Sequence, residues 1–216
     1  MSPIPETPSR DCPLCPRLAA FRADNRSKFP DWHNAPVRCF GELGGRLLIV
    51  GLAPGLRGAN RTGRPFTGDY AGKLLYDTLL KFGFATGRYE ERPDDGLSLH
   101  DCRIVNAVRC VPPENKPLPA EIAACNRFLA SEIGAMANLR AILALGVVAH
   151  QAALRVHGLK QSFAKFAHGA THDLPNGIVL TNSFHVSRYN TSTRRLTPAM
   201  FEAVVASLKQ RVGGAT

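Results

Sequence analysis

The feature that most constrains the fold is an apolar run followed directly by a long glycine-rich segment. Residues 47–50 have the sequence LLIV and lie between glycines. Such a run is typical of a strand buried on both faces of a parallel sheet. A helical pattern begins near residue 71, after the turn residues Gly51, Pro54, Gly55, Gly58, Gly63 and Gly68. Loops at the carboxyl ends of parallel strands form ligand sites, so the sequence predicts a site between residues 51 and 72.

The rest of the chain repeats the alternation of strand and helix. We predict further strands at 103–108, 141–145 and 178–181, and helices at 16–30, 71–84, 119–136, 146–157 and from Pro198 onward. Residues 85–102 are expected to form a polar connection. Alternation of this kind over 216 residues predicts one α/β domain, a three-layer α/β/α sandwich around a central four-stranded, mainly parallel sheet.

The glycine-rich segment could in principle hold the phosphates of a nucleotide. It contains neither G-x-x-x-x-G-K-[ST] nor a G-x-G-x-x-G directly after the strand. Kinase motifs are missing as well, which disfavours a zinc-bound phosphotransferase. The segment therefore points to another kind of ligand.

Four of the six cysteines are spaced like the ligands of a metal site. Cys12 and Cys15 form a C-x-x-C pair, and fourteen residues separate Cys110 from Cys125. On spacing alone, four thiolates suit zinc and a [4Fe–4S] cluster equally. The two remaining cysteines, Cys39 and Cys102, are expected to be buried as small apolar side chains.

The charge balance is strongly basic, with 27 Lys and Arg against 17 Asp and Glu and a net charge of +10. This excess suits a polyanionic partner such as nucleic acid, although it could also serve solubility alone. The sequence contains no run long enough to span a membrane and begins without a signal-peptide core. We expect a cytoplasmic monomer that does not bind membranes.

The sequence words GLAPG at 51–55 and NRTGRPFTGD at 60–69, followed by Gly72, resemble the first motif of the uracil-DNA glycosylase superfamily. The match is to its iron–sulfur type called family 5, or type b. Leu52 stands where the related family 4 has an acidic residue, which favours family 5. The cysteine spacing is similar to that of families 4 and 5, so the resemblance implies a [4Fe–4S] cluster on Cys12, Cys15, Cys110 and Cys125. The cluster would anchor the N-terminal segment to a single domain over residues 1–216.

A glycosylase must flip the base out of the duplex and hold it in a pocket. Phe66 is the candidate aromatic platform, and Asn106 could pair with the N–H and keto oxygen of uracil or hypoxanthine. Alternatively, Phe66 is a core residue and Asn106 bonds its own loop. The resemblance implies that the substrate also meets Gly51, Ala53, Pro54, Gly55 and His185.

Two further side chains are candidates for the bond cleavage. His185 lies in SFHVSRYN, which is similar to the HPS-type motif of the superfamily except that Val186 replaces the usual proline. Its imidazole would stabilise charge on the leaving base. Asp69 would position water or shield the cationic sugar, and its alternative role is to cap the following helix. His168 lies in a segment that resembles family 5, but we assign it no chemistry.

The segment at 188–195 is polar and basic and follows His185 closely. In the superfamily the matching loop enters the DNA minor groove, and the alternative is a solvated loop. Residues predicted to contact DNA are Arg188, Tyr189, Asn190, Arg194 and Arg195 here, and Arg57, Arg61, Arg64, Lys160 and Lys165 elsewhere.

Taken with the resemblance, these residues predict a monofunctional DNA glycosylase acting in base excision repair. It would hydrolytically remove uracil, and other deaminated bases such as hypoxanthine and xanthine, from double-stranded DNA and leave an abasic site. The alternative is a non-catalytic iron–sulfur module that binds damaged or single-stranded DNA, because leucine at position 52 cannot activate water.

Overall fold

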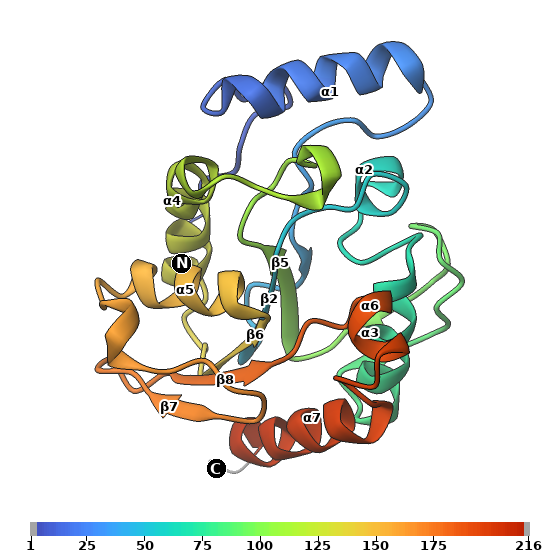
Figure 1. Ribbon diagram of the computed structural model, residues 1–216. Coiled ribbons are helices and arrows are strands. Elements are labelled where there is room, and N and C mark those ends of the chain that lie inside the picture. The colour runs from blue at the N-terminus through green and yellow to red at the C-terminus, as the bar shows by residue number, and fades with distance from the viewer. Residues whose placement is uncertain (1–3, 214–216) are drawn as a thin grey trace.

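A central β-sheet organises the chain in the computed structural model, which describes residues 4–213 (Figure 1). The predicted domain over residues 1–216 therefore includes three residues at each end that lie outside the described part. Four parallel strands form the middle of the sheet: β5 (Cys102–Asn106), β2 (Leu47–Gly51), β6 (Ala141–Leu145) and β8 (Val179–Ser183). These are the four strands expected from the sequence, and the α/β fold class is confirmed.

A short antiparallel strand extends the sheet at each edge. β1 (Phe40–Gly41) pairs with β5, and β7 (Thr171–Asp173) pairs with β8. Strands of two or three residues are too short to show an alternating pattern in the sequence. The structure thus corrects the expected number of strands from four to six, while the middle of the sheet remains parallel.

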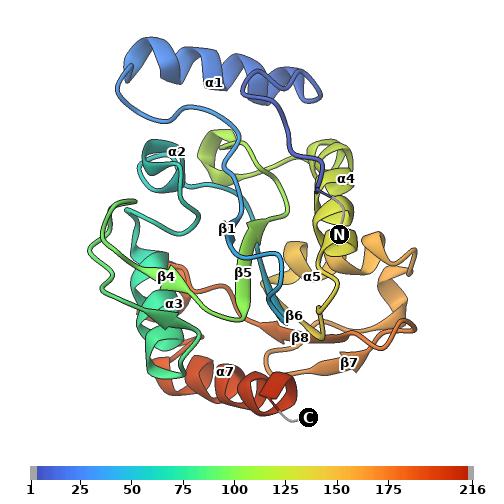
Figure 2. The same ribbon diagram turned by 180° about the vertical axis from the view of Figure 1, so that it is seen from behind.

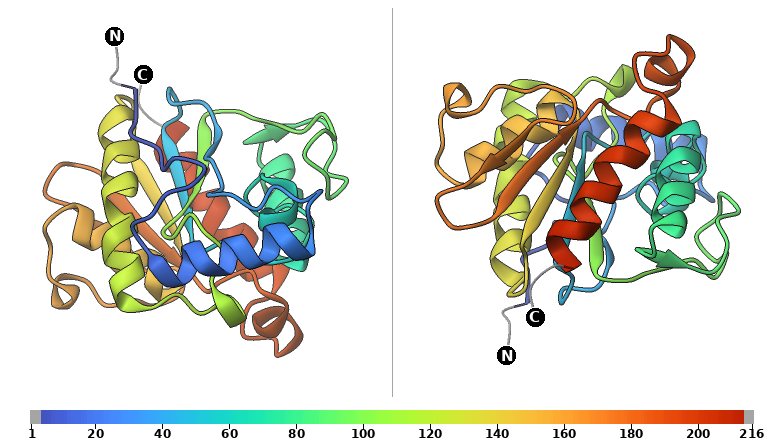
Figure 3. Two further views of the ribbon diagram at one scale, coloured as in Figure 1. Left: turned by 90° about the horizontal axis from the view of Figure 1, so that it is seen from above. Right: turned by 90° about the horizontal axis from the view of Figure 1, so that it is seen from below.

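Helices cover both faces of the sheet (Figures 2 and 3). One face carries α3 (Tyr70–Lys81) and α7 (Pro198–Gly213), and the other carries α4 (Pro119–Ala135) and α5 (Val147–Val156). α1 (Pro16–Lys28) lies across one end of the molecule, and α2 (Ala59–Thr62) and α6 (Arg188–Ser192) are short. The remaining elements are β3 (Ala85–Thr86), β4 (Ser98–Leu99) and the 3₁₀ turns η1 (Pro113–Asn115) and η2 (Gln161–Phe163). None of the helices between residues 4 and 213 is long and apolar enough to cross a membrane.

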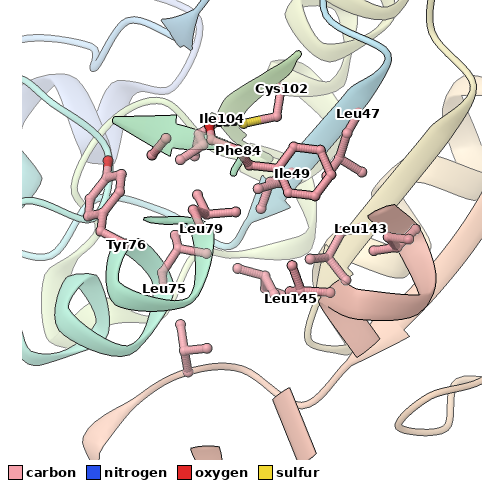
Figure 4. Packing of buried hydrophobic residues seen from close by; sticks show 14 of the residues in the cluster. Leu47, Ile49, Leu75, Tyr76, Leu79, Phe84, Cys102, Ile104, Leu143 and Leu145 are labelled. Carbon is pink, nitrogen blue, oxygen red and sulfur yellow. Dashed lines mark hydrogen bonds between the residues drawn. The ribbon is translucent and has the colours of Figure 1, made fainter. Parts of the chain in front are cut away.

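Alternate side chains of β2 enter two different cores. Leu47 and Ile49 pack in the cluster that includes α3 and α7 (Figure 4), whereas Leu48 and Val50 pack in the cluster that includes α5. All four side chains are fully buried, and each such burial contributes about 1.5–3 kcal/mol. The strand that leads into the glycine-rich loop is therefore held firmly on both faces.

The segment between α1 and β1 is fastened to α2. The Asn34 backbone N–H donates to the Asn60 carbonyl at 3.1 Å, and the Asn60 side-chain amide donates to Asn34 Oδ1 at 2.9 Å. The His33 N–H also donates to the Arg61 carbonyl at 3.0 Å. Because Asn34 and Asn60 are both buried, the N-terminal part of the chain directly supports the loop that follows β2.

A buried carboxylate on α4 binds two arginines near β5. Glu132 lies 2.6 Å from Arg103 Nε and 3.3 Å from Arg109 Nη2, and it also accepts a hydrogen bond from the Cys39 thiol at 2.9 Å. The Glu132 and Arg109 side chains are at most 1% exposed. Charges buried this deeply are tolerated only when they are paired.

Replacing Glu132 by alanine should lower the free energy of unfolding by about 3–5 kcal/mol, because it leaves the Arg109 charge buried and unpaired. Urea denaturation measures the loss. Asp77→Ala is the matched control, since Asp77 forms an exposed i,i+4 pair with Lys73 and should contribute less than about 0.5 kcal/mol. Equal losses in the two variants would contradict a stabilising role for the buried pair.

Candidate active site

A pocket is lined by residues of the loops after β2, β5 and β8 and of the helices α2, α3 and α6. Most of the predicted base-binding and catalytic residues line it together: Ala53, Pro54, Gly55, Phe66, Asp69, Asn106 and His185. These residues come from positions up to 132 apart in the chain, and the parallel strands bring them to one end of the sheet. The site predicted for residues 51–72 is therefore completed by β5 and by the segment after β8.

Gly51 allows the pocket to exist at the point where β2 ends. A Cβ atom at this position would lie 2.6 Å from Phe66 Cζ and would collide with Asn106 Oδ1. Gly51 and Asn106 are neighbours in the parallel register of β2 and β5. The glycine is thus required by the close approach of a ring and an amide, although it does not line the pocket itself.

Asn106 carries an unused hydrogen-bonding group. Its side chain is buried, and its Oδ1 has no hydrogen-bond partner among the described residues. A buried acceptor without a partner costs free energy unless a ligand or water satisfies it. The side chain ends in the pocket, and so its carbonyl oxygen is available to a donor placed there.

Phe66 belongs both to the pocket and to the adjacent core. Its side chain is 6% exposed, and its ring centre lies 6.0 Å from that of His185 with 30° between the planes. Its backbone φ is +53°, a left-handed conformation that is costly for a residue with a bulky side chain. This conformation must therefore be imposed by surrounding contacts.

Asp69 directly precedes α3, but its side chain makes no capping hydrogen bond to that helix. Its Oδ1 is buried and has no hydrogen-bond partner between residues 4 and 213, and its Oδ2 packs so closely on Gly58 that a Cβ there would collide with it. Burial raises the pKa of this carboxyl, and the nearby amides of Gly72 and Ala71 offset part of the rise. The Asp69 carboxylate that lines the pocket is therefore poorly solvated.

His185 follows β8 and is half-buried. Burial lowers the pKa of its imidazole to about 4, so the ring is neutral at neutral pH and carries one N–H donor. The Asn190 side-chain amide donates to the His185 carbonyl at 2.8 Å, and Val186 is fully buried. These contacts hold the turn in which valine replaces the proline of the superfamily motif.

The predicted DNA-contacting residues separate into exposed and buried ones. Arg57 and Arg188 are exposed and line the pocket mouth, where the Arg188 guanidinium lies 5.2 Å from the Tyr70 ring centre. Tyr189 is 71% exposed on α6. Arg61, Lys160, Lys165, Arg194 and Arg195 are also exposed.

The side chains of two residues in the predicted DNA-contacting set form a hydrogen bond or an ion pair within the fold. Asn190 supports the His185 turn, as described above. Arg64 is buried and forms an ion pair with Asp95 at 2.7 Å. We therefore remove Arg64 from the set of phosphate contacts, because its guanidinium does not reach the surface.

The four cysteines of the predicted metal site line a second pocket, together with Leu18, Val108 and Phe128. Arg22 Nη1 donates to Cys110 Sγ at 3.4 Å, and the Arg109 N–H donates to Cys125 Sγ at 3.3 Å. Burial raises the pKa of Cys110 to about 11 and that of Cys125 to about 12, so metal binding must displace their protons. In the described part of the chain, no three Cys, His, Asp or Glu side chains converge on the position of one metal ion. Four thiols around one apolar pocket, two with N–H donors, still fit as ligands for a soft metal centre.

The other two cysteines serve the fold. The thiol of Cys39 donates to Glu132, and Cys102 is fully buried with its thiol 3.4 Å from the Phe84 carbonyl. His168 also has a supporting role, because its Nδ1 accepts the Phe184 N–H at 3.2 Å and its ring stacks on Phe184.

Sequence reasoning missed several lining residues. Tyr70, Ser187 and Asn115 line the pocket. Tyr70 and Ser187 could have been found because each lies within two residues of a predicted catalytic side chain. Asn115 could not, since it reaches the pocket from the proline-rich loop through a backbone with φ of +57°.

Known proteins resemble this chain over most of its length. The family model of the uracil DNA glycosylase superfamily matches residues 40–209. The chain is 45% identical over 208 residues to a type-5 uracil-DNA glycosylase of Thermus thermophilus, covering 94% of each protein. It is 40% identical over 210 residues to a type-5 uracil-DNA glycosylase of Mycobacterium tuberculosis, covering 94% of this chain and 78% of that protein. A type-4 uracil-DNA glycosylase of Thermotoga maritima is 36% identical over 148 residues, which are 68% of this chain and 67% of that protein.

This chain belongs to the uracil DNA glycosylase superfamily. The resemblance seen in the sequence is confirmed, and relatives named as type 5 match it over most of its length.

The depressed pKa of His185 predicts a pH dependence of stability. The unfolded chain binds a proton on this histidine near its usual pKa of about 6.5, whereas the folded protein binds it only near pH 4. The stabilisation is therefore complete above about pH 6.5 and is lost as the pH falls towards 4. Urea denaturation between pH 7 and 4 should show a smaller loss of stability for His185→Gln than for the wild type. The same pH dependence in both proteins would contradict the buried, neutral state of His185.

Proposed function

We propose that the chain is a type-5 uracil-DNA glycosylase, a monofunctional enzyme that flips uracil out of double-stranded DNA and hydrolyses its N-glycosidic bond. The abasic site that it leaves is the substrate of later steps in base excision repair. The observation that supports this most strongly is the unpartnered amide oxygen of Asn106 in a pocket shared with Phe66, Asp69 and His185. The cytoplasm is the location that we expect.

Base selection follows from the two ends of the Asn106 amide. The Oδ1 accepts from N3–H of uracil while the Nδ2 donates to O4, and N1–H and O6 of hypoxanthine or xanthine present the same pair. Adenine and cytosine present the opposite pattern. Because the Asn106 oxygen is buried, a base without the matching N–H leaves it unpaired, and this penalty gives the discrimination. Deaminated purines are therefore proposed as further substrates.

Cleavage of the bond between C1′ and the base leaves an electron pair on the base and a positive charge on the sugar. The neutral His185 imidazole can donate its N–H to the base O2, where negative charge develops. The Asp69 carboxylate can offset the cationic sugar and orient the water that adds to C1′, taking up the proton that the water releases. Leu52 has no polar group, so these two side chains must share the work.

The hydrolytic course is proposed because no lysine is found among the described residues that line the pocket. A lyase that cuts the DNA backbone would need an amine nucleophile there. Exposed arginines near the mouth, Arg57 and Arg188, would hold phosphates, and Arg61, Arg194 and Arg195 would extend this contact. The exposed Tyr189 on α6 would enter the minor groove as the base leaves the stack.

Cys12, Cys15, Cys110 and Cys125 would hold a [4Fe–4S] cluster. When bound, it supplies a covalent link between distant segments, and hydrolysis of a glycosidic bond transfers no electrons. The surrounding chain contributes the N–H donors of Arg22 and Arg109 and an apolar wall. These residues join the N-terminal segment to α4 and to the segment after β5.

Single-turnover release of uracil from duplex DNA tests the function and the two catalytic roles. His185→Ala should slow the step by roughly 100- to 1000-fold, the usual value of one well-placed donor. Asp69→Asn should cause a similar loss if the carboxylate charge acts, and little loss if it does not, since Asn suits the position before a helix as well as Asp.

The control for this experiment is His100→Ala, because His100 is exposed and lies outside the pocket. Release of uracil by the wild type but not by Asn106→Ala would separate catalysis from mere DNA binding. Wild-type rates in both His185→Ala and Asp69→Asn would show that the pocket has been assigned wrongly. The same assay with hypoxanthine and xanthine duplexes tests the wider base range.

Metal analysis tests the cysteine site. The purified protein should contain iron and absorb visible light, and Cys110→Ser should lose both and become less soluble. Cys39→Ser is the control and should keep its iron, because Cys39 lies outside the cysteine pocket. Stoichiometric zinc without iron would overturn the cluster assignment.

A further inference from the structure

The guanidinium of Arg64 is buried and is surrounded by one carboxylate and three aromatic rings. Its two terminal nitrogens donate to the Asp95 carboxylate at 2.8 and 2.7 Å. The guanidinium carbon lies 5.2 Å from the ring centre of Phe40, 5.5 Å from that of Tyr76 and 5.9 Å from that of Tyr89. We call these five residues the Arg64 cage.

The polar groups of the cage make hydrogen bonds within the fold. The Asp95 side chain is completely buried, and its carboxylate also accepts the backbone N–H groups of Glu90 at 2.9 Å and Leu97 at 3.1 Å. Arg64 Nε donates to the Thr67 hydroxyl at 2.7 Å. The ion pair therefore fastens the connection at residues 90–97 to the loop after β2, which are far apart in the sequence.

Two hydroxyl groups of the cage hold the backbone of the Phe66 turn. The Tyr76 hydroxyl donates to the Pro65 carbonyl at 2.6 Å, and the Tyr89 hydroxyl donates to the Phe66 carbonyl at 3.0 Å. Gly72 makes room for this second bond, because a Cβ there would collide with both partners. Phe66 has the left-handed conformation described above, which needs such external support.

We infer that Tyr89 is a positioning residue for base excision: its hydroxyl, held by the Arg64 cage, keeps the Phe66 ring in place against the flipped base. The inference rests on the role proposed for Phe66 as the stacking platform. Burial raises the pKa of the Tyr89 phenol to about 12, so the hydroxyl remains a donor at every pH where the protein is assayed. Tyr89 itself does not line the pocket and does not touch the substrate.

Tyr89→Phe tests the inference, because it removes the hydroxyl and keeps the ring of the cage. The maximal single-turnover rate of uracil release should fall by roughly 10-fold, a part of the stacking contribution that Phe66→Ala removes completely. Affinity for a duplex carrying a tetrahydrofuran abasic-site analogue should be unchanged, since that ligand places no base against Phe66. In a Phe66→Ala background, Tyr89→Phe should cause no further loss of rate.

Thr86→Val is the matched control. It also removes a single hydroxyl, one that bonds His100 in the same connection between α3 and β5, but it lies away from the Phe66 turn. Its rate should equal that of the wild type. An unchanged rate in Tyr89→Phe, the same proportional loss with and without Phe66, or an equal loss in Thr86→Val would overturn the positioning role. If the wild type released no uracil, the proposed function itself would fall, and the inference with it.

Discussion

The site depends on a close contact between the adjacent strands β2 and β5 at their carboxyl ends, where Gly51 lies beside Asn106. Gly51 has no side chain, and so the Asn106 amide and the Phe66 ring can occupy the space above it. This glycine ends β2, and because every residue of that strand is buried, the position of Gly51 in the sheet is fixed. The left-handed turn at Phe66 and the ring of His185 adjoin that contact.

Desolvation is the common cause of the properties of the three polar groups. It raises the pKa of Asp69, lowers that of His185, and leaves Asn106 with an unsatisfied oxygen. In water these groups would be hydrated and would have to lose that hydration before acting. Here burial has already removed part of that hydration, as the shifted pKa values of Asp69 and His185 show.

The residues that line the pocket are easier to predict from the sequence than the contacts that hold them in place. Asn106 and Gly51 stand out because a polar residue and a glycine end strongly apolar strands. Arg64 was expected on the DNA surface beside Arg57 and Arg61, but its partner Asp95 lies 31 residues away in a segment expected to be a plain connection. The pairing of such distant residues leaves no local pattern in the sequence. The edge strand β1 leaves none either, because it is only two residues long.

Hydrogen bonds between residues 33–34 and 60–61 join α2 to the segment between α1 and β1. This segment follows the part of the chain that contributes Cys12 and Cys15 to the cysteine pocket. Because the bonds between Asn34 and Asn60 are buried, we expect the two segments to open together as one unit of local unfolding. The amide protons of His33 and Asn34 therefore act as natural reporters for the loop after β2. Amide exchange at these two positions records how often that loop detaches from the protein.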